Sequence, residues 1–271
     1  MCDLCVIDAV KNQMLTRRGV FTGAAALAAA ATATSVAAPA ALAGGHGGVV
    51  DMTHTLSPEF PTWGGPPGIA IEQFARFEKD GYNLLNLTIN EHTGTHIDAP
   101  LHFSADGTAV DEIAVTDLVA PLCVIDIAAR AAEDADAQVT PEDIAAWTDA
   151  HGPIPPHACV AMHSGWGTKT DSDAFRGFDG TAQHYPGFHV DAAQMLIEDG
   201  NAASIAVDTL SLDHGPSPDF ATHYLWLPSG RFGIENLANL QEVPASGATL
   251  VIGAPKHKGG TGGPARIFAM I

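Results

Sequence analysis

The chain has 271 residues, of which 46% are hydrophobic, so it is long enough to bury a core and an enclosed active site. Its 12 Lys and Arg residues stand against 31 Asp and Glu residues, which gives a formal net charge of -19. This excess of negative charge disfavours binding to nucleic acid or to an anionic membrane surface, and it favours a small molecule as the partner.

Residues 1–43 are typical of an export signal of the twin-arginine type. The paired arginines Arg17 and Arg18 precede an alanine-rich apolar run that ends in Ala-Leu-Ala at Ala43. A membrane anchor is the alternative, but alanine is only weakly apolar and the run is poor in leucine. We therefore expect the twin-arginine export machinery to recognise the precursor, and residues 44–271 to act as one periplasmic or secreted domain.

The cysteines fall into two pairs. Cys2 and Cys5 form a C-x-x-C pattern inside the signal, so they have no expected role in the exported domain. Cys123 and Cys159 lie in apolar, strand-like runs. Two buried thiols are favoured there over a disulfide, even in an oxidising compartment.

Runs of β-branched and aliphatic residues, each bounded by turn residues, predict strands along the rest of the chain. They cover residues 48–56, 69–77, 82–90, 122–128, 158–164, 203–210, 248–254 and 265–271.

Two segments predict helices. Residues 140–150 open with Thr140 as a cap, Pro141 at the first helical position and Asp143 in a capping-box place. Residues 189–200 have apolar helical spacing and end in a glycine. Because strands outnumber helices and no linker or repeat divides the chain, the sequence predicts one α+β domain around a mixed or barrel-like sheet.

Residues 91–102, EHTGTHIDAPLH, concentrate three histidines and an aspartate in twelve positions. Pro100 and the Thr-Gly-Thr stretch disfavour a helix, whereas an extended chain places positions 92, 94, 96, 98 and 102 on one face. A straight strand would separate positions 92 and 96 by about 13 Å. Binding of one ion by both therefore requires a bend, which Gly94 makes inexpensive.

His92, His96 and Asp98 are a suitable set of ligands for Zn(II) or Mn(II), and His102 could instead transfer protons. A lone histidine is usually structural, but this concentration in one Gly-bent segment favours metal coordination. Export of an already folded protein would also let it bind a weakly competing ion such as Mn(II) before Zn(II) or Cu(II) is available.

The same segment resembles the signature H-x-G-T-H-x-D-x-P-x-H of the cyclase family, metal-dependent hydrolases that include bacterial kynurenine formamidase and isatin hydrolase. Residues 208–220, 223–237 and 253–266 fit the family in the same order, so the resemblance covers about residues 51–271. It implies a compact fold of the swivelling β/β/α type and assembly into homodimers or larger homo-oligomers.

The resemblance also implies residue roles. The family's metal ligands match His92, His96, Asp98, His223 and Glu235. Asp98 would bridge two ions where a second is present, His223 and Glu235 would serve the second ion, and His102 matches the residue assigned to proton transfer. A divalent ion lowers the pKa of water and polarises an amide carbonyl, while an imidazole can move the protons. One or two ions per chain, Mn(II) or Zn(II), are expected.

Other residues allow two interpretations. Trp63 and Trp166 lie in Gly-rich loops, where each could form a wall of a flat substrate pocket or pack in the core. His54 and His214 could line the site or support a ligand. His163 could mark a different substrate or be a core residue, and the core interpretation is favoured.

The remaining features have simpler interpretations. Histidines 46, 151, 157 and 257 lie among turn residues and are expected at the surface. Ser164 lacks the glycine two residues earlier that a nucleophile elbow requires. Gly262 and Gly263 predict a tight turn near the site rather than a phosphate loop, because no helix pattern follows.

The sequence therefore predicts an exported, metal-dependent amidohydrolase that opens an amide or a cyclic amide. An isatin-like lactam is favoured over N-formylkynurenine, since export would separate the enzyme from intracellular tryptophan breakdown. The competing class is a periplasmic metal- or ligand-binding protein without turnover. His102, which an ion does not need, argues for the enzyme, and a structural module would give no reason for five ligand-type residues.

Overall fold

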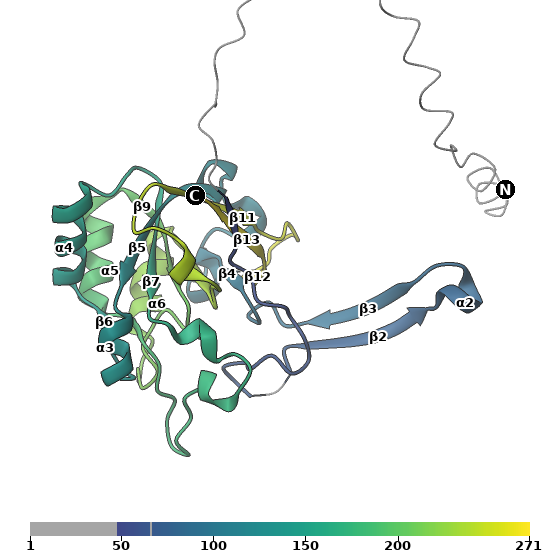
Figure 1. Ribbon diagram of the computed structural model, residues 1–271. Coiled ribbons are helices and arrows are strands. Elements are labelled where there is room, and N and C mark those ends of the chain that lie inside the picture. Colours follow the sequence, from purple (N-terminus) through teal and green to yellow (C-terminus); the bar gives the residue numbers. More distant parts are fainter. Residues whose placement is uncertain (1–47, 66) are drawn as a thin grey trace, which may run out of the picture. The chain divides into compact units, whose positions relative to one another are not determined.

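A nine-stranded mixed sheet organises residues 48–65 and 67–271, the part of the chain that the computed structural model describes (Figure 1). The strand order is β1-β13-β11-β5-β7-β9-β10-β4-β12. These strands are β1 (Val49–Asp51), β4 (His96–Asp98), β5 (Val119–Asp126), β7 (Ala158–His163), β9 (Ala202–Val207), β10 (Phe232–Glu235), β11 (Ala248–Gly253), β12 (Gly262–Pro264) and β13 (Arg266–Met270). The predicted α+β class is confirmed, and the predicted export signal lies outside the described residues.

The centre of the sheet is parallel and its flanks are antiparallel. β5, β7, β9 and β10 run in one direction, whereas β11, β13 and β1 on one side and β4 and β12 on the other pair antiparallel. Parallel strands are covered on both faces, which explains why β5 and β7 are continuous apolar runs in the sequence. A short parallel pair, β6 (Gln138–Val139) and β8 (Gly187–Phe188), lies apart from this sheet.

Alternate residues of the central strands enter two separate cores. Leu122 and Val124 of β5 belong to the apolar cluster shared with β1, β11 and β13, while Cys123 packs in the cluster shared with the helices. Cys159 of β7 belongs to the first cluster. The two thiols therefore point to opposite faces of the sheet, are free, and burial raises the pKa of each to about 12. The prediction of two buried thiols is confirmed.

Both predicted helices are present. α4 (Pro141–His151) begins with the Thr140–Asp143 capping box, in which the Thr140 amide donates to Asp143 Oδ2 at 2.8 Å. α5 (Val190–Asp199) ends at Gly200, whose φ of 79° is the left-handed conformation that glycine adopts without strain. No helix among the described residues is long and apolar enough to cross a membrane.

Three further helices escaped the sequence analysis. α2 (Phe77–Asp80), α3 (Ala128–Glu133) and α6 (Ala221–Trp226) have four, six and six residues, too few for a helical apolar pattern to repeat. The first predicted strand was also too long, because β1 ends at Asp51. Beyond it the Thr53 hydroxyl exchanges hydrogen bonds with the backbone of Ile267, which replaces a regular strand ladder.

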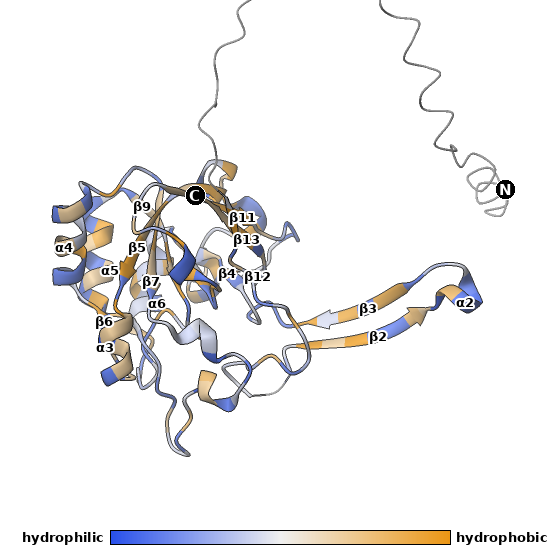
Figure 2. Cartoon of the chain, viewed as in Figure 1, coloured by the Kyte–Doolittle hydropathy of each residue, from blue (hydrophilic) through white to orange (hydrophobic). Residues whose placement is uncertain are grey.

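A two-stranded hairpin, β2 (Ile69–Ala75) and β3 (Leu84–Ile89), stands away from the nine-stranded sheet, with α2 at its tip (Figure 1). Both strands were predicted, but nothing in their patterns showed that they leave the sheet. The register places Ile71 opposite Leu87 and Ile69 opposite Ile89, so one face of the hairpin is apolar. Ile71, Leu85, Leu87 and Ile89 are 41–52% exposed on this face. Figure 2 colours parts of both strands as hydrophobic.

Candidate metal centre and substrate cavity

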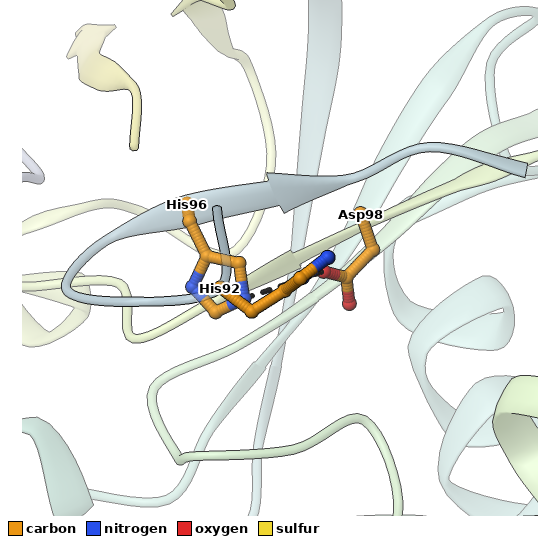
Figure 3. Close-up of side chains that lie close together, drawn as sticks. All are labelled: His92, His96 and Asp98. Atoms are coloured by element: carbon orange, nitrogen blue, oxygen red, sulfur yellow. Dashed lines mark hydrogen bonds and ion pairs between the residues drawn. The ribbon is translucent and has the colours of Figure 1, made fainter. Parts of the chain in front are cut away.

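Two neighbouring strands, β4 and β10, and the loop before β4 bring the first site residues together. His96 and Asp98 are two residues apart on β4, so both side chains leave the same face of the strand (Figure 3). Glu235, at the end of β10, is directly opposite His96 in the antiparallel register. His92 precedes β4 and reaches the same place because the chain bends at Gly94, whose φ is 61°. The predicted bend is confirmed.

The short helix α6 supplies His223. Its N-cap is Phe220, a non-glycine residue held at φ 52°, so the chain turns sharply into the helix beside the site. Nε2 of His223 lies 3.5 Å from Asp98 Oδ2 and 3.2 Å from Glu235 Oε1.

The five side chains form two groups that share Asp98. One group is His92, His96 and Asp98, and the other is Asp98, His223 and Glu235; in each group the potential ligand atoms lie within 4.8 Å of one another. Asp98 Oδ1 is 2.7 Å from His92 Nδ1 and 3.3 Å from His96 Nε2. The structure thus brings together all five residues that the resemblance implied as ligands, with Asp98 in the bridging position.

Hydrogen bonds behind two of the imidazoles fix which nitrogen faces the centre. His96 Nδ1 donates to the Gly94 carbonyl at 2.9 Å, and His223 Nδ1 donates to Asp213 Oδ2 at 2.6 Å. Asp213 is itself held by the Thr222 amide at 2.8 Å. Both rings therefore turn Nε2 toward the carboxylates, the arrangement typical of histidine ligands with outer-shell partners. Sequence analysis considered His214 for this supporting role, which its neighbour Asp213 fills.

The residues fit a divalent metal ion. Nε2 of His96 and Oδ2 of Asp98 are buried without a hydrogen-bond partner, which is costly unless a cation satisfies them. Burial alone would lower the pKa of His96, but Asp98 and Glu235 outweigh it and raise this pKa to about 10. The cluster thus stabilises positive charge at its centre. Imidazole nitrogens with carboxylate oxygens are the ligand set of Zn(II) and Mn(II).

His102 lies against this cluster without belonging to either group. It is on the 3₁₀ helix η1 (Pro100–Phe103), so the prediction that residues 92–102 are extended throughout is wrong beyond β4; Pro100 at the start of the turn ends the strand. The His102 ring stacks on His92 with the centroids 3.7 Å apart. Burial lowers the pKa of His102 to about 4, so its imidazole is neutral near pH 7.

A cavity of about 430 Å³ opens over these residues, within the range of small-molecule sites. Its aromatic walls are Trp63, Phe103 and Phe220. Trp63 is 49% exposed and packs on Phe220 with ring centroids 5.7 Å apart, while Phe103 packs on His223 at 4.6 Å. Phe103 and Phe220 were not predicted as site residues; their only signal in the sequence was proximity to His102 and His223.

Trp166 does not line this cavity, so its predicted role as a pocket wall is wrong. It is 4% exposed, its indole N–H donates to the Phe175 carbonyl at 2.7 Å, and it packs in a small aromatic cluster with Phe60 and Tyr185. The alternative of core packing is the correct one. Buried Trp requires a partner for its N–H, and this site provides one.

No other histidine among the described residues belongs to the two ligand groups. His163 is partly buried at the end of β7, with Nδ1 3.3 Å from Asp126 Oδ1, and His54 packs its ring on Phe60 and Phe175. His151, His157 and His257 are exposed, as predicted, whereas His46 lies outside the described residues.

Ser164 is no nucleophile elbow. Its hydroxyl donates to the buried carboxylate of Asp208 at 2.5 Å.

Comparison with known proteins agrees with this geometry. The family model described as "Putative cyclase" matches residues 50–214. The chain belongs to the cyclase family of metal-dependent hydrolases. It is 34% identical over 250 residues to an isatin hydrolase of Roseibium aggregatum, covering 86% of this chain and 95% of the relative.

A second relative and a solved structure extend the comparison. The chain is 28% identical over 223 residues to a kynurenine formamidase of Salinibacter ruber, covering 80% of this chain and 95% of that one. The crystal structure of an isatin hydrolase bound to the product analogue thioisatinate matches with a TM-score of 0.78 and 32% identity, covering 82% of this chain and 92% of that one.

The cluster predicts that a divalent ion stabilises the folded protein through Asp98. At a free ion concentration of about 100 times Kd, binding should add about 2.7 kcal/mol and raise Tm by about 5–10 °C. Asp98→Asn should abolish this rise, because it removes the carboxylate that both groups share. The measurement is thermal unfolding of metal-stripped protein with and without Mn(II) or Zn(II). Asp149→Asn, an exposed change on α4, is the control; an equal rise in both variants contradicts the assignment.

Proposed function

We propose that this protein hydrolyses a cyclic or aryl amide, with an isatin-like lactam as the preferred substrate. The observation that carries the proposal is the convergence of two metal-type ligand groups and a neutral imidazole on one aromatic-walled cavity. The isatin hydrolase and kynurenine formamidase relatives support an amide as the substrate class. Export, which the Arg17–Arg18 signal supports, favours a substrate met outside the cytoplasm.

We propose one or two Mn(II) or Zn(II) ions as the cofactor. His92, His96 and Asp98 would hold the first ion, and Asp98, His223 and Glu235 would hold the second. When bound, the ion supplies Lewis-acid chemistry, since it lowers the pKa of a water molecule and polarises an amide carbonyl. The buried acceptors and the shared carboxylate support occupancy by cations.

His102 performs the proton transfers in this proposal. Its neutral imidazole accepts a proton from the attacking water as the new C–O bond forms at the amide carbon. The same ring then donates this proton to the amide nitrogen as the C–N bond breaks. The products are an amine and a carboxylic acid, which ionises by releasing the second proton of the water to solvent, so water is consumed and no other reactant is needed. The stacking of His102 on His92 keeps its ring beside the ligand groups.

The cavity suits a flat amide. Trp63 and Phe220 offer ring faces against which an aromatic substrate can pack. Asn236, which also lines the cavity, commits its Nδ2 to the Gly94 carbonyl at 2.8 Å, so its buried Oδ1 is left as an acceptor without a partner.

The proton-transfer role predicts a specific kinetic defect. His102→Ala should lower kcat by about 10²- to 10⁴-fold, because the general acid and base is lost. Metal content should stay unchanged, since His102 is in neither ligand group. Initial rates with isatin and with N-formylkynurenine, together with elemental analysis, measure both effects. His151→Ala, at the exposed end of α4, is the control.

Each outcome of this experiment is informative. An unchanged kcat in His102→Ala with metal still bound removes the proton-transfer role. Turnover of N-formylkynurenine in preference to isatin selects the aryl formamide as substrate, and metal binding without turnover of either favours the ligand-binding alternative.

We also propose that the chain forms a homo-oligomer in which a second copy covers the apolar face of the β2–β3 hairpin. A two-stranded hairpin with an exposed apolar face is only marginally stable alone in water, so a partner surface would stabilise it. Gly68 and Asn90 at the base of the hairpin line the substrate cavity, so the partner would sit close to its entrance. Closed homo-oligomers are the most common assemblies of this kind.

The oligomer proposal predicts that charges on this face separate the copies. The double variant Leu85→Glu, Leu87→Glu should have a smaller mass than the wild type in size-exclusion chromatography with light scattering. Val115→Glu, at a residue that is 75% exposed outside the hairpin, should leave the mass unchanged. A monomeric wild type, or an unchanged mass in the double variant, contradicts the proposal.

A further inference from the structure

His92 is held from behind by the Gly-rich segment near the C-terminus. Its Nε2 lies 3.0 Å from Thr261 Oγ1. The Thr261 hydroxyl donates to Glu91 Oε2 at 2.6 Å, and the Thr261 amide lies 3.2 and 3.3 Å from the two oxygens of the same carboxylate. A chain of side chains therefore runs from this imidazole through a hydroxyl to a carboxylate.

The number of available protons fixes the direction of each bond. An ionised carboxylate can only accept, so the single hydroxyl proton of Thr261 goes to Glu91. Toward His92 the Thr261 oxygen can then only accept, and Nε2 of His92 must carry the proton. In the neutral ring Nδ1 is consequently unprotonated, and it faces Asp98 Oδ1 at 2.7 Å. Two acceptors at this distance repel one another unless a cation or a proton lies with them.

At Gly260 and Gly262 the C-terminal segment packs so closely on Glu91 and His92 that there is no room for a side chain. A Cβ atom at Gly262 would lie 2.8 Å from Cε1 of His92 and 2.3 Å from the Ile97 carbonyl oxygen. A Cβ atom at Gly260 would lie 2.8 Å from Glu91 Oε1. The backbone of β12 therefore packs directly on the His92 ring, and Thr261 is the residue between these two glycines.

We propose that Thr261 and Glu91 are positioning residues that hold His92 in the tautomer presenting Nδ1 to the metal ion, and that they thereby set the affinity of the site for that ion. The inference rests on the proposed metal site and assigns a function to the C-terminal segment. His96 and His223 present Nε2 instead, because a backbone carbonyl and Asp213 accept from their Nδ1 atoms.

The hydrogen-bonded residues that hold His92 extend to the protein surface, unlike the partners of His96 and His223. Glu91 Oε1 contacts His257 Nε2 at 2.5 Å, and the His257 side chain is 47% exposed. Neither Thr261 nor Glu91 belongs to the ligand groups. Substitutions at Thr261 or Glu91 change the hydrogen-bond partners of His92 while leaving the five ligand side chains intact.

The test compares metal affinity in variants of the full chain. Thr261→Val removes the hydroxyl at nearly constant volume, while Thr261→Ser keeps it. Competition with a chromogenic chelator gives the Kd for Mn(II) and for Zn(II). Loss of an outer-shell partner typically weakens metal binding about 10- to 100-fold, which is the loss expected for Thr261→Val. Thr261→Ser should remain within about threefold of the wild type, because it can still accept from Nε2 and donate to Glu91.

Glu91 gives a second, independent pair of variants. In Glu91→Ala the freed Thr261 hydroxyl can donate to His92 Nε2 and select the wrong tautomer, so metal binding should weaken as in Thr261→Val. Glu91→Gln keeps a carbonyl oxygen that accepts the hydroxyl proton, and it should retain more affinity than Glu91→Ala. The tautomer itself is read from the ¹⁵N chemical shifts of the His92 ring in the metal-free protein.

A matched control separates this role from general destabilisation. Thr249→Val on β11 makes the same chemical change outside the ligand groups and should leave both Kd values unchanged. Thermal unfolding without metal verifies that each variant folds. If Thr261→Val does not fold, the metal affinities of the two Glu91 variants test the positioning role instead. Wild-type affinity in both Thr261→Val and Glu91→Ala overturns the inference. A wild type that binds no ion overturns the proposed function instead.

Discussion

Asp98 is the constraint on which the site depends. This carboxylate is 1% exposed, and its two oxygens face the imidazoles of His92, His96 and His223. A buried charge of this kind is tolerated only where opposite charge and hydrogen bonds compensate for lost hydration. With Glu235 beside it, the site holds two carboxylates among three imidazoles, a composition that stabilises a cation. The sheet, the bend before β4 and helix α6 all serve to place these atoms around one carboxylate.

The topology explains how residues distant in sequence meet there. β4 lies between β10 and β12, and its register puts Glu235 opposite His96 on one side and Gly262 opposite Asp98 on the other. Of the two antiparallel neighbours of β4, β10 supplies the candidate ligand Glu235, and β12 supplies a closely packed backbone at Gly262. His102, the proposed proton-transfer residue, follows β4 in a separate turn and stays outside both ligand groups.

The local part of the site could be predicted from sequence, and the tertiary part could not. The bend at Gly94 and the ligand character of residues 91–102 follow from residue type and spacing. The pairing of His223 and Glu235 with them required the family resemblance. Phe220 reaches the cavity through a left-handed turn that no periodic pattern reveals. The Thr261–Glu91 contact joins residues 170 positions apart, a separation at which sequence spacing carries no geometric information.

Metal content and turnover measured on one sample test the central claim most directly. The protein should be purified without chelator, analysed for Mn and Zn, and assayed with isatin and N-formylkynurenine. The account predicts about one or two ions per chain and hydrolysis of isatin in preference to the formamide, with both lost on metal removal and restored on readdition. A metal-free protein that still hydrolyses either substrate, or one that cannot be loaded with either ion, would contradict it.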